Sequence, residues 1–289
     1  MAGFTKRTPE QRKADAEALH ATLVDQVAAL TDSAQWRRFL DFTRSFHAYS
    51  LNNLLLILSQ CPDASAVAGF RQWQAKGRQV RKGEKSIKIF GYSTKKFTEE
   101  NTETGEETER RVPRFAILSV FDIAQTDPID GAEILDPVSV LTGADDHGVL
   151  DPLTAHLQAD GWTVTREHLP AANGVTRPET RAVVLHDQLA TEQAAKTLIH
   201  EAAHIQLGHT DDLAEYTQHR GRMETEAESV AYIVAGLLGF DTSSYSVGYI
   251  AGWADGNPAL IRETAARVLT AARHVANAIT PADTAQEAA

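Results

Sequence analysis

The chain has 289 residues, 43% of them hydrophobic, and a formal net charge of −11 at pH 7, which together allow a large core and predict two domains. Its single cysteine, Cys61, excludes an intramolecular disulfide framework and indicates a reducing compartment. The N-terminus lacks an apolar signal region and no run approaches about 18 apolar residues, which argues against a membrane span and predicts a cytoplasmic protein.

The first half of the chain predicts helices and antiparallel strands. In chain order, the patterns predict helices at residues 6–30, 34–47 and 51–60, an extended segment at 66–69, a helical turn at 71–76, and paired strands at 86–92 and 115–121. The polar, acidic segment 94–111 predicts an exposed hairpin or a disordered insertion. Two prolines and a glycine in residues 127–137 predict an inter-domain linker.

The second half predicts alternating helices and strands. Helices are expected at residues 151–159, 192–207, 222–239 and 257–278, and strands at 162–166 and 181–186. The whole pattern predicts an α+β fold, with an N-terminal domain of helices and antiparallel sheet over residues 1–130. A second domain would span residues 131–280, and residues 281–289 would form a disordered tail.

Charge is distributed unevenly along the chain. Residues 1–95 hold 15 Lys and Arg against 8 Asp and Glu, giving +7, and the remainder holds 13 against 31, giving −18. Any polyanion is therefore expected to bind the N-terminal part. Seven of its cations lie within residues 71–88, where Glu84 is the single acidic residue.

Aromatic residues accompany these cations. Phe70, Trp73 and Phe90 lie among or beside them, and Tyr49 and Tyr92 are nearby. Cations follow a phosphate backbone and aromatic faces stack on unpaired bases, so this mixture is typical of single-strand nucleic-acid binding. An ordinary basic surface with Trp73 in the core is the alternative interpretation.

Residues 200–204 read His-Glu-Ala-Ala-His, in a segment without Pro or Gly that predicts a helix. His200 and His204 are four residues apart, so they project from one helix face and can bind one metal ion together. Glu201 is then placed to take a proton from a metal-bound water, as in HExxH metallopeptidases.

Three glutamates of the next predicted helix compete to be the third ligand. Glu224 follows His204 after nineteen residues and shares a helix face with Glu228, whereas Glu226 points largely away from both. We assign Glu224 to a bound Zn²⁺ and Glu228 to a hydrogen bond with a ligand imidazole. The alternative is a solvated acidic helix face beside two surface histidines.

Two further features bear on a peptidase. The strand predicted at 181–186 precedes the HExxH helix, and its edge could pair with an extended peptide. Tyr249 is the preferred donor to a reaction oxyanion, with Tyr245 as the other candidate, although either could be a core residue.

Several N-terminal motifs together resemble a known family. They read Tyr49-Ser-Leu-Asn-Asn-Leu-Leu-Leu-Ile57, Val67-Ala-Gly-Phe70, Gly77-Arg-Gln-Val-Arg-Lys-Gly-Glu-Lys85 and Val120-Phe-Asp-Ile-Ala-Gln-Thr126, and they resemble the N-terminal domain of ArdC-type antirestriction proteins. The resemblance implies a single-stranded DNA-binding domain, a role on mobile elements, and a following zincin-like metallopeptidase domain. The candidate DNA contacts are Tyr49, Asn53, Trp73, Arg78, Arg81, Lys82 and Lys85.

Three functions remain open on the sequence. The first is a single-stranded DNA-binding protein with a zinc metallopeptidase-like domain, acting in antirestriction or mobile-element establishment. The second is a regulatory zinc metalloprotease that cleaves a repressor protein. The third is a DNA-binding protein whose zinc site is not catalytic.

Overall fold

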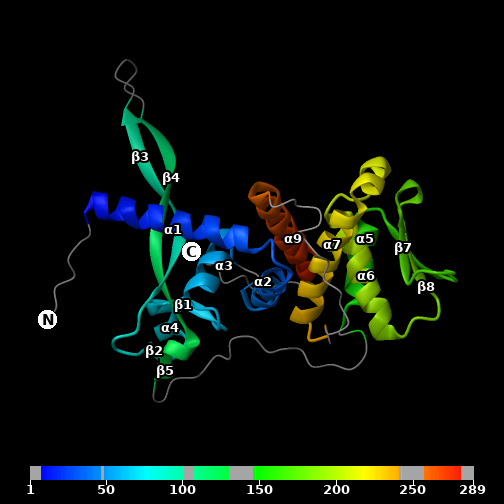
Figure 1. The fold of residues 1–289 in the computed structure, drawn as a ribbon, viewed down its shortest axis with the longest axis horizontal. Helices are drawn as coiled ribbons and strands as arrows, with labels where there is room; N and C mark the ends of the chain where they lie inside the picture. The colour runs from blue at the N-terminus through cyan, green and yellow to red at the C-terminus, as the bar shows by residue number, and fades with distance from the viewer. Residues whose placement is uncertain are drawn as a thin grey trace. The chain divides into compact units, whose positions relative to one another are not determined.

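The computed structural model describes residues 8–46, 49–100, 107–129, 146, 148–240, 242 and 257–280, with the backbone alone for 92–100 and 107–115. Helices and mostly antiparallel strands make up the described chain, which confirms the α+β class (Figure 1). Among the described helices, none combines the length and apolar character that a membrane span needs.

The chain divides into two compact units that are not contiguous in sequence. The N-terminal unit takes Met1–Leu23 and Asn52–Leu135, and the C-terminal unit takes Val24–Leu51 and Asp136–Ala285. Residues 24–51 therefore leave the N-terminal domain that the sequence analysis drew over 1–130. Helix α2 (Ser33–Phe46) explains why, because Trp36 donates to Ser229 across 3.1 Å and Tyr232 donates to Asp41 across 2.5 Å.

The N-terminal unit contains two small antiparallel sheets. The first has the order β1-β4-β3, formed by β1 (Val67–Gly69), β4 (Glu107–Asp122) and β3 (Ile87–Glu100). Its β3–β4 ladder runs out to the pair Glu100↔Glu107, so the hairpin interpretation of residues 94–111 holds for the described part. The second pairs β2 (Arg78–Val80) with β5 (Thr126–Pro128). Helices α3 (Leu51–Gln60) and α4 (Phe70–Ala75) and the first part of α1 (Pro9–Ala29), up to Leu23, complete this unit.

Helix α3 closes the free edge of β3 with side-chain amides. Asn53 donates to the Phe90 carbonyl across 2.8 Å and accepts from the Phe90 N–H across 2.9 Å. Gln60, two turns along the helix, makes the same pair of bonds with Lys88 at 2.8 and 2.9 Å. Edge strands expose unpaired N–H and C=O groups, and here two amides substitute for a neighbouring strand.

The C-terminal unit is a helical layer packed on one small sheet. Strands β6 (Thr163–Glu167), β8 (Ala182–His186) and β7 (Gly174–Arg177) have the order β6-β8-β7, with β6 parallel and β7 antiparallel to β8. Helix α6 (Thr191–Gln206) packs against β7 and β8 on one side and against α7 (Leu213–Leu237) and α9 (Pro258–Ile279) on the other (Figure 1). Helix α5 (Leu150–Ala159) contacts α6, α9 and β6.

Two sequence features adapt the helices to this packing. Ala194, Ala195, Ala202 and Ala203 of α6 are all buried, and their small side chains let α6 lie between sheet and helices. In α7, His219 has the non-helical angles φ −115° and ψ 22°, so the helix expected from Arg222 is preceded by a second helical segment. Gly239 has φ 82° after the end of α7, which is the left-handed conformation that glycine permits.

Candidate metal centre

Helices α6 and α7 bring together the three side chains predicted to bind metal. The His200 and His204 Nε2 atoms lie 3.1 Å apart, and Glu224 Oε2 lies 3.6 and 3.7 Å from them. One ligand atom from each residue lies within 4.8 Å of the others. Two imidazoles and a carboxylate of this geometry can hold a metal ion and leave a fourth position open.

Each imidazole is fixed through its other ring nitrogen. His200 Nδ1 lies 3.2 Å from Glu228 Oε2, and His204 Nδ1 lies 3.0 Å from His209 Nδ1. These contacts orient both rings with Nε2 toward Glu224. Glu228 thus lies where the sequence analysis expected it, and His209 is a partner that the analysis missed.

A buried charged network continues behind His209. Glu226 Oε2 lies 2.9 Å from His209 Nε2 and 3.5 Å from Arg267 Nη1, and Thr264 donates to Glu226 Oε1 across 3.2 Å. The side chains of His209 and Glu226 are each only 1% exposed. Glu226 therefore contacts one of the three candidate ligands, His204, indirectly through His209. No sequence spacing indicated this, because His209 lies beyond the end of α6.

Tyr216 is a second residue that the sequence analysis missed. Its hydroxyl donates a short hydrogen bond to Glu224 Oε1, and its ring lies edge-on to His204 at 5.9 Å between centroids. Tyr216 precedes Glu224 by two turns of α7, on the far side of the break at His219. The predicted oxyanion donor Tyr249, and its alternative Tyr245, lie outside the described residues.

The contacts among these side chains favour ionised Glu224 and protonated His200. Burial alone would lower the pKa of His200, but its contacts with Glu224 and Glu228 outweigh burial and raise that pKa to about 10. The two histidines hold the pKa of Glu224 well below its usual range. Burial and the bond to Glu224 raise the pKa of Tyr216 to about 12, while burial lowers the pKa of His209.

Glu201 lies in a cleft beside the metal-binding cluster. The cleft has a volume of about 330 Å³ and is lined by Asn173, Gly174, Gln193, Lys196, Thr197, His200, Glu201 and Glu228. Glu201 is 7% exposed, and its Oε2 accepts a hydrogen bond from the Thr176 hydroxyl across 2.7 Å. One carboxylate oxygen is therefore fixed by β7, which leaves the other available to a ligand in the cleft.

The strand that borders this cleft is β7, not β8. The sequence analysis gave residues 181–186 a free edge, but β8 is paired on both sides, with β6 and with β7. In the described sheet, β7 is an edge strand, and Gly174 approaches Glu201 so closely that an added Cβ would lie 2.9 Å from Glu201 Oε1. An extended peptide would therefore have to pair with β7.

The aromatic and amide candidates for DNA contact have structural roles instead. Trp73 is 2% exposed, packs with Ala68 and Val80, and donates to the Phe121 carbonyl across 2.8 Å. This is the core interpretation, and it leaves no open face for a base. Asn53 forms the amide bridge to β3 described above.

Tyr49 is not grouped with the basic cluster either. It belongs to the C-terminal unit, where Arg273 donates to its carbonyl and burial raises the pKa of its hydroxyl.

The four cationic candidates divide into two pairs. Arg78 donates to Thr126, and Arg81 forms ion pairs with Glu84 and Asp127 at 2.9 and 3.3 Å. Lys82 and Lys85 are exposed, and neither ammonium group has an ion-pair or hydrogen-bond partner among the residues that the structure describes. Lys82 and Lys85 are therefore the cations most available to a phosphate.

Comparison with known proteins agrees with the N-terminal motifs. Residues 14–121 match the family described as the N-terminal domain of anti-restriction factor ArdC. An uncharacterised protein of Bacillus anthracis is 26% identical over 286 residues, covering 86% of this chain and 48% of the relative, so the chain spans about half the length of that curated relative.

Solved structures of similar proteins include the antirestriction ArdC protein from the R388 plasmid. Its metal-free structure has 21% identity and a TM-score of 0.47, covering 82% of this chain and 87% of that one. Its Mn(II)-bound structure has 20% identity and a TM-score of 0.46, covering 84% and 98%. On this match, residues 14–121 are an ArdC-like N-terminal domain of that anti-restriction family.

Proposed function

We propose that this ArdC-like chain acts in antirestriction, with a single-stranded DNA-binding N-terminal part and a metal-dependent peptidase in its C-terminal unit. The observation that carries the enzymatic half is the placement of His200, His204 and Glu224 beside Glu201 in one cleft. A non-catalytic metal site would need the three ligands, but it would not need an adjacent fixed carboxylate and an edge strand.

The donor set fits a divalent ion, with Zn²⁺ favoured. His200 and His204 would bind through Nε2, because their Nδ1 atoms are engaged by Glu228 and His209. Two imidazoles and one carboxylate are typical ligands of catalytic zinc. When bound, the ion would lower the pKa of a water and polarise a carbonyl.

Proton transfer and substrate binding would be carried out by the protein's own side chains and backbone. The free oxygen of Glu201 would accept the proton of the attacking water and return it to the leaving amine. Thr176 would keep the carboxylate in place through its 2.7 Å bond. The exposed backbone edge of β7 would bind the substrate as an extended strand, which supports a peptide rather than a small molecule.

Glu201→Gln tests the peptidase. We expect the variant to keep its zinc, because Glu201 is not a ligand, and to lose at least about a hundredfold in hydrolysis of casein used as a general substrate. Glu192→Gln is the matched control, since Glu192 lies on the same helix, is exposed and pairs with Lys196 across 2.9 Å. If zinc-loaded wild-type protein and Glu201→Gln were equally inactive on casein and on other unfolded proteins, the non-catalytic alternative would be favoured.

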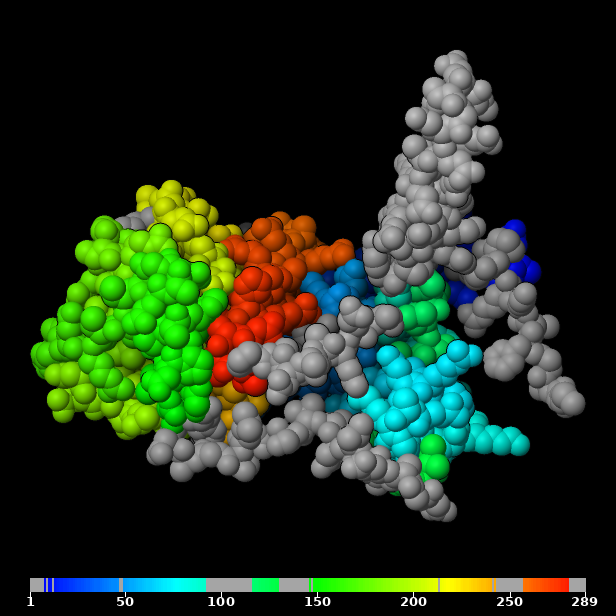
Figure 2. Space-filling model, turned by 180° about the vertical axis from the view of Figure 1, so that it is seen from behind, coloured from blue at the N-terminus to red at the C-terminus, as the bar shows by residue number. Residues whose placement is uncertain are grey.

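The proposed DNA binding is supported by the exposed basic loop of residues 81–85. Arg81 donates to the Ala124 carbonyl across 2.5 Å, and Gln125 donates to the Lys85 carbonyl across 2.9 Å. These bonds fix the loop between them, and Asp122 in turn caps the Ile123–Gln125 turn. Lys82 and Lys85 are both exposed on this backbone, within the part of the chain that Figure 2 draws in cyan.

Phe70 is the aromatic residue that could stack on a base in place of the buried Trp73. It is 43% exposed and borders a groove of about 810 Å³ that is also lined by Val80, Arg81, Lys82 and Phe121. An open aromatic ring beside an exposed lysine is the combination that single-strand binding uses. We therefore propose that an unpaired base stacks on Phe70 while Lys82 contacts a phosphate.

Phe70→Ala and Lys82→Gln test this groove. Phe70→Ala is expected to weaken binding of a single-stranded oligonucleotide about tenfold, within the roughly 1–3 kcal/mol of a base–aromatic stack. Lys82→Gln should flatten the slope of log K against log salt by about 0.7, whereas Lys13→Gln, at an exposed lysine of α1, should not. Unchanged affinity in both groove variants would exclude the groove as the binding site.

A further inference from the structure

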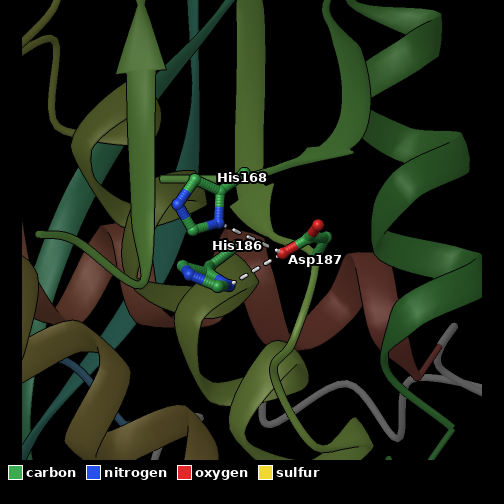
Figure 3. Close-up of side chains that lie close together, drawn as sticks. All are labelled: His168, His186 and Asp187. Carbon is green, nitrogen blue, oxygen red and sulfur yellow. Dashed lines mark ion pairs between the residues drawn. The ribbon is translucent and has the colours of Figure 1, made fainter. Parts of the chain in front are cut away.

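A second group of metal-ligating side chains lies at the end of the C-terminal sheet, and it shares no residue with the metal centre. His168 follows β6, His186 ends β8, and Asp187 comes next. Asp187 Oδ1 lies 3.2 Å from His186 Nδ1 and 4.0 Å from His168 Nδ1. Figure 3 shows both imidazoles directed toward this one carboxylate oxygen.

The backbone fixes the positions from which these side chains project. Strands β6 and β8 are parallel, with Glu167 paired to His186, so their carboxyl ends meet at one edge of the sheet. The Asp187 N–H donates to the Glu167 carbonyl across 3.0 Å, and the His186 N–H donates to the Asn173 carbonyl across 2.8 Å. The pairing of β6 with β8 therefore brings the three side chains close together.

The contact between His186 and Asp187 lacks a bridging hydrogen. His186 Nδ1 accepts the backbone N–H of Gln188 across 3.0 Å, so this nitrogen presents a lone pair rather than a proton. Its 3.2 Å approach to a carboxylate oxygen therefore brings two acceptor atoms together. A cation between them would relieve that repulsion, and the exposed Gln188 N–H would then bond to water.

We propose that His168, His186 and Asp187 form a second site for a divalent transition-metal ion of the Zn²⁺, Co²⁺ or Ni²⁺ type. Two imidazoles and one carboxylate select such ions over Mg²⁺ and Ca²⁺, which prefer oxygen ligands. His168 is 74% exposed at its side chain, so its ring can turn the short distance to complete the site, with water in the remaining position.

The bound ion would tie the end of β6 to the end of β8. The bond from the His186 N–H to the Asn173 carbonyl extends that tie to the start of β7, which borders the Glu201 cleft. The site is therefore structural, and the proposal does not depend on peptidase activity.

The test uses the full chain with its first centre removed. The His200→Ala, His204→Ala double variant should still bind about one Zn²⁺ by calorimetry, and it should not respond to Mg²⁺. Adding His168→Ala should weaken that Zn²⁺ affinity at least tenfold, and it should abolish the zinc-dependent rise in Tm of the double variant. His274→Ala, at an exposed histidine of α9, is the matched control.

The outcomes separate this proposal from the proposed function. A folded double variant that binds no Zn²⁺ would overturn the second site, as would an affinity unchanged by both His168→Ala and Asp187→Asn. His168 is so exposed that its replacement is not expected to prevent folding. Loss of casein hydrolysis in the double variant would concern the first centre alone.

Discussion

The proposed metal ligands His200 and His204 are oriented by partners of different chemistry. Glu228 holds His200 directly, whereas His204 is held by His209, which rests in turn on the buried carboxylate of Glu226. Such partners fix the ring orientation and the tautomer of a ligand imidazole. The affinity for metal should therefore depend on residues that never touch the ion.

Glu228→Gln tests this dependence. Losing the carboxylate should weaken zinc affinity about 10–100-fold, because Gln cannot stabilise the His200 Nδ1–H as strongly. A competition titration with a chelator measures the change, and Glu215→Gln, at an exposed position of the same helix, should leave affinity unaltered. Equal affinities for the two variants would contradict a role for Glu228.

Proton competition gives a second prediction at this scale. The pKa of His200 is raised from 6.5 to about 10 in the metal-free centre, so a proton occupies His200 at neutral pH and must leave when metal binds. Observed zinc affinity should therefore rise with pH, by up to about tenfold per unit below pH 10, and Glu228→Gln should flatten this dependence.

The raised pKa of His200 also makes the stability of the metal-free protein depend on pH. Because the folded pKa lies above the unfolded value, the protonated His200 stabilises the metal-free protein fully below about pH 6.5, and the contribution disappears as pH rises through about 10. Thermal unfolding of the metal-free protein across this pH range measures that contribution.

Zinc affinity that does not change between pH 6 and 8 would contradict the assignment of the proton to His200.

At the scale of elements, the helices and the strands β1, β6 and β8 were predictable, whereas the short strands β2, β5 and β7 were not. The periodic apolar pattern placed α3 at 51–60, and the structure has Leu51–Gln60; α6 begins at Thr191, within one residue of its predicted start. Strand β7 was missed because its burial does not alternate and its existence depends on pairing with β8. A pairing partner distant in sequence leaves no local signal.

The residues of the candidate site likewise divide into those placed by local spacing and those placed by tertiary contacts. That His200 shares a helix face with His204, and Glu224 with Glu228, followed from helical spacing, which is local. His209, Tyr216 and the burial of Trp73 depend on tertiary contacts that spacing does not encode. The spacing of the basic cluster likewise could not distinguish the exposed Lys82 from Arg81, which is paired with Glu84.

Strand β7 supports a prediction about the cleft. A Cβ at Gly174 would lie 2.5 Å from Thr197 Cγ2, so Gly174→Ala should displace β7 from Glu201, lower the Tm and reduce any casein hydrolysis. Gly221→Ala is the matched control: its Cβ meets nothing within 4 Å, and alanine in a helix should stabilise the protein by up to about 1 kcal/mol. Equal Tm shifts in the same direction would contradict the close approach of β7.

At the scale of the whole molecule, the two proposed activities belong to different compact units. The first 95 residues carry +7 and the remainder −18, but this split does not follow the units, so the attraction for phosphate is local to the cations at residues 71–88. Neither the loop at 81–85 nor Phe70 shares a compact unit with the metal centre. The domain boundary near residue 130 nevertheless stays a prediction.

This separation predicts that the two activities are independent. Glu201→Gln should leave affinity for a single-stranded oligonucleotide within about twofold of wild type, well under the tenfold that 1.4 kcal/mol represents. Fluorescence anisotropy at one fixed salt concentration provides the measurement. A large loss of affinity with zinc content and folding intact would mean that the cleft itself handles nucleic acid.

The amide bridges from α3 to β3 also have a consequence for hydrogen exchange. The Lys88 and Phe90 N–H groups lie on the outer edge of the described sheet, where exchange with solvent is normally fast, yet each is bonded to a glutamine or asparagine of α3. Their deuterium uptake should therefore be slow and should follow the opening of a helix rather than the fraying of a strand. Two backbone amides of a β-strand would thus report, residue by residue, how often α3 detaches.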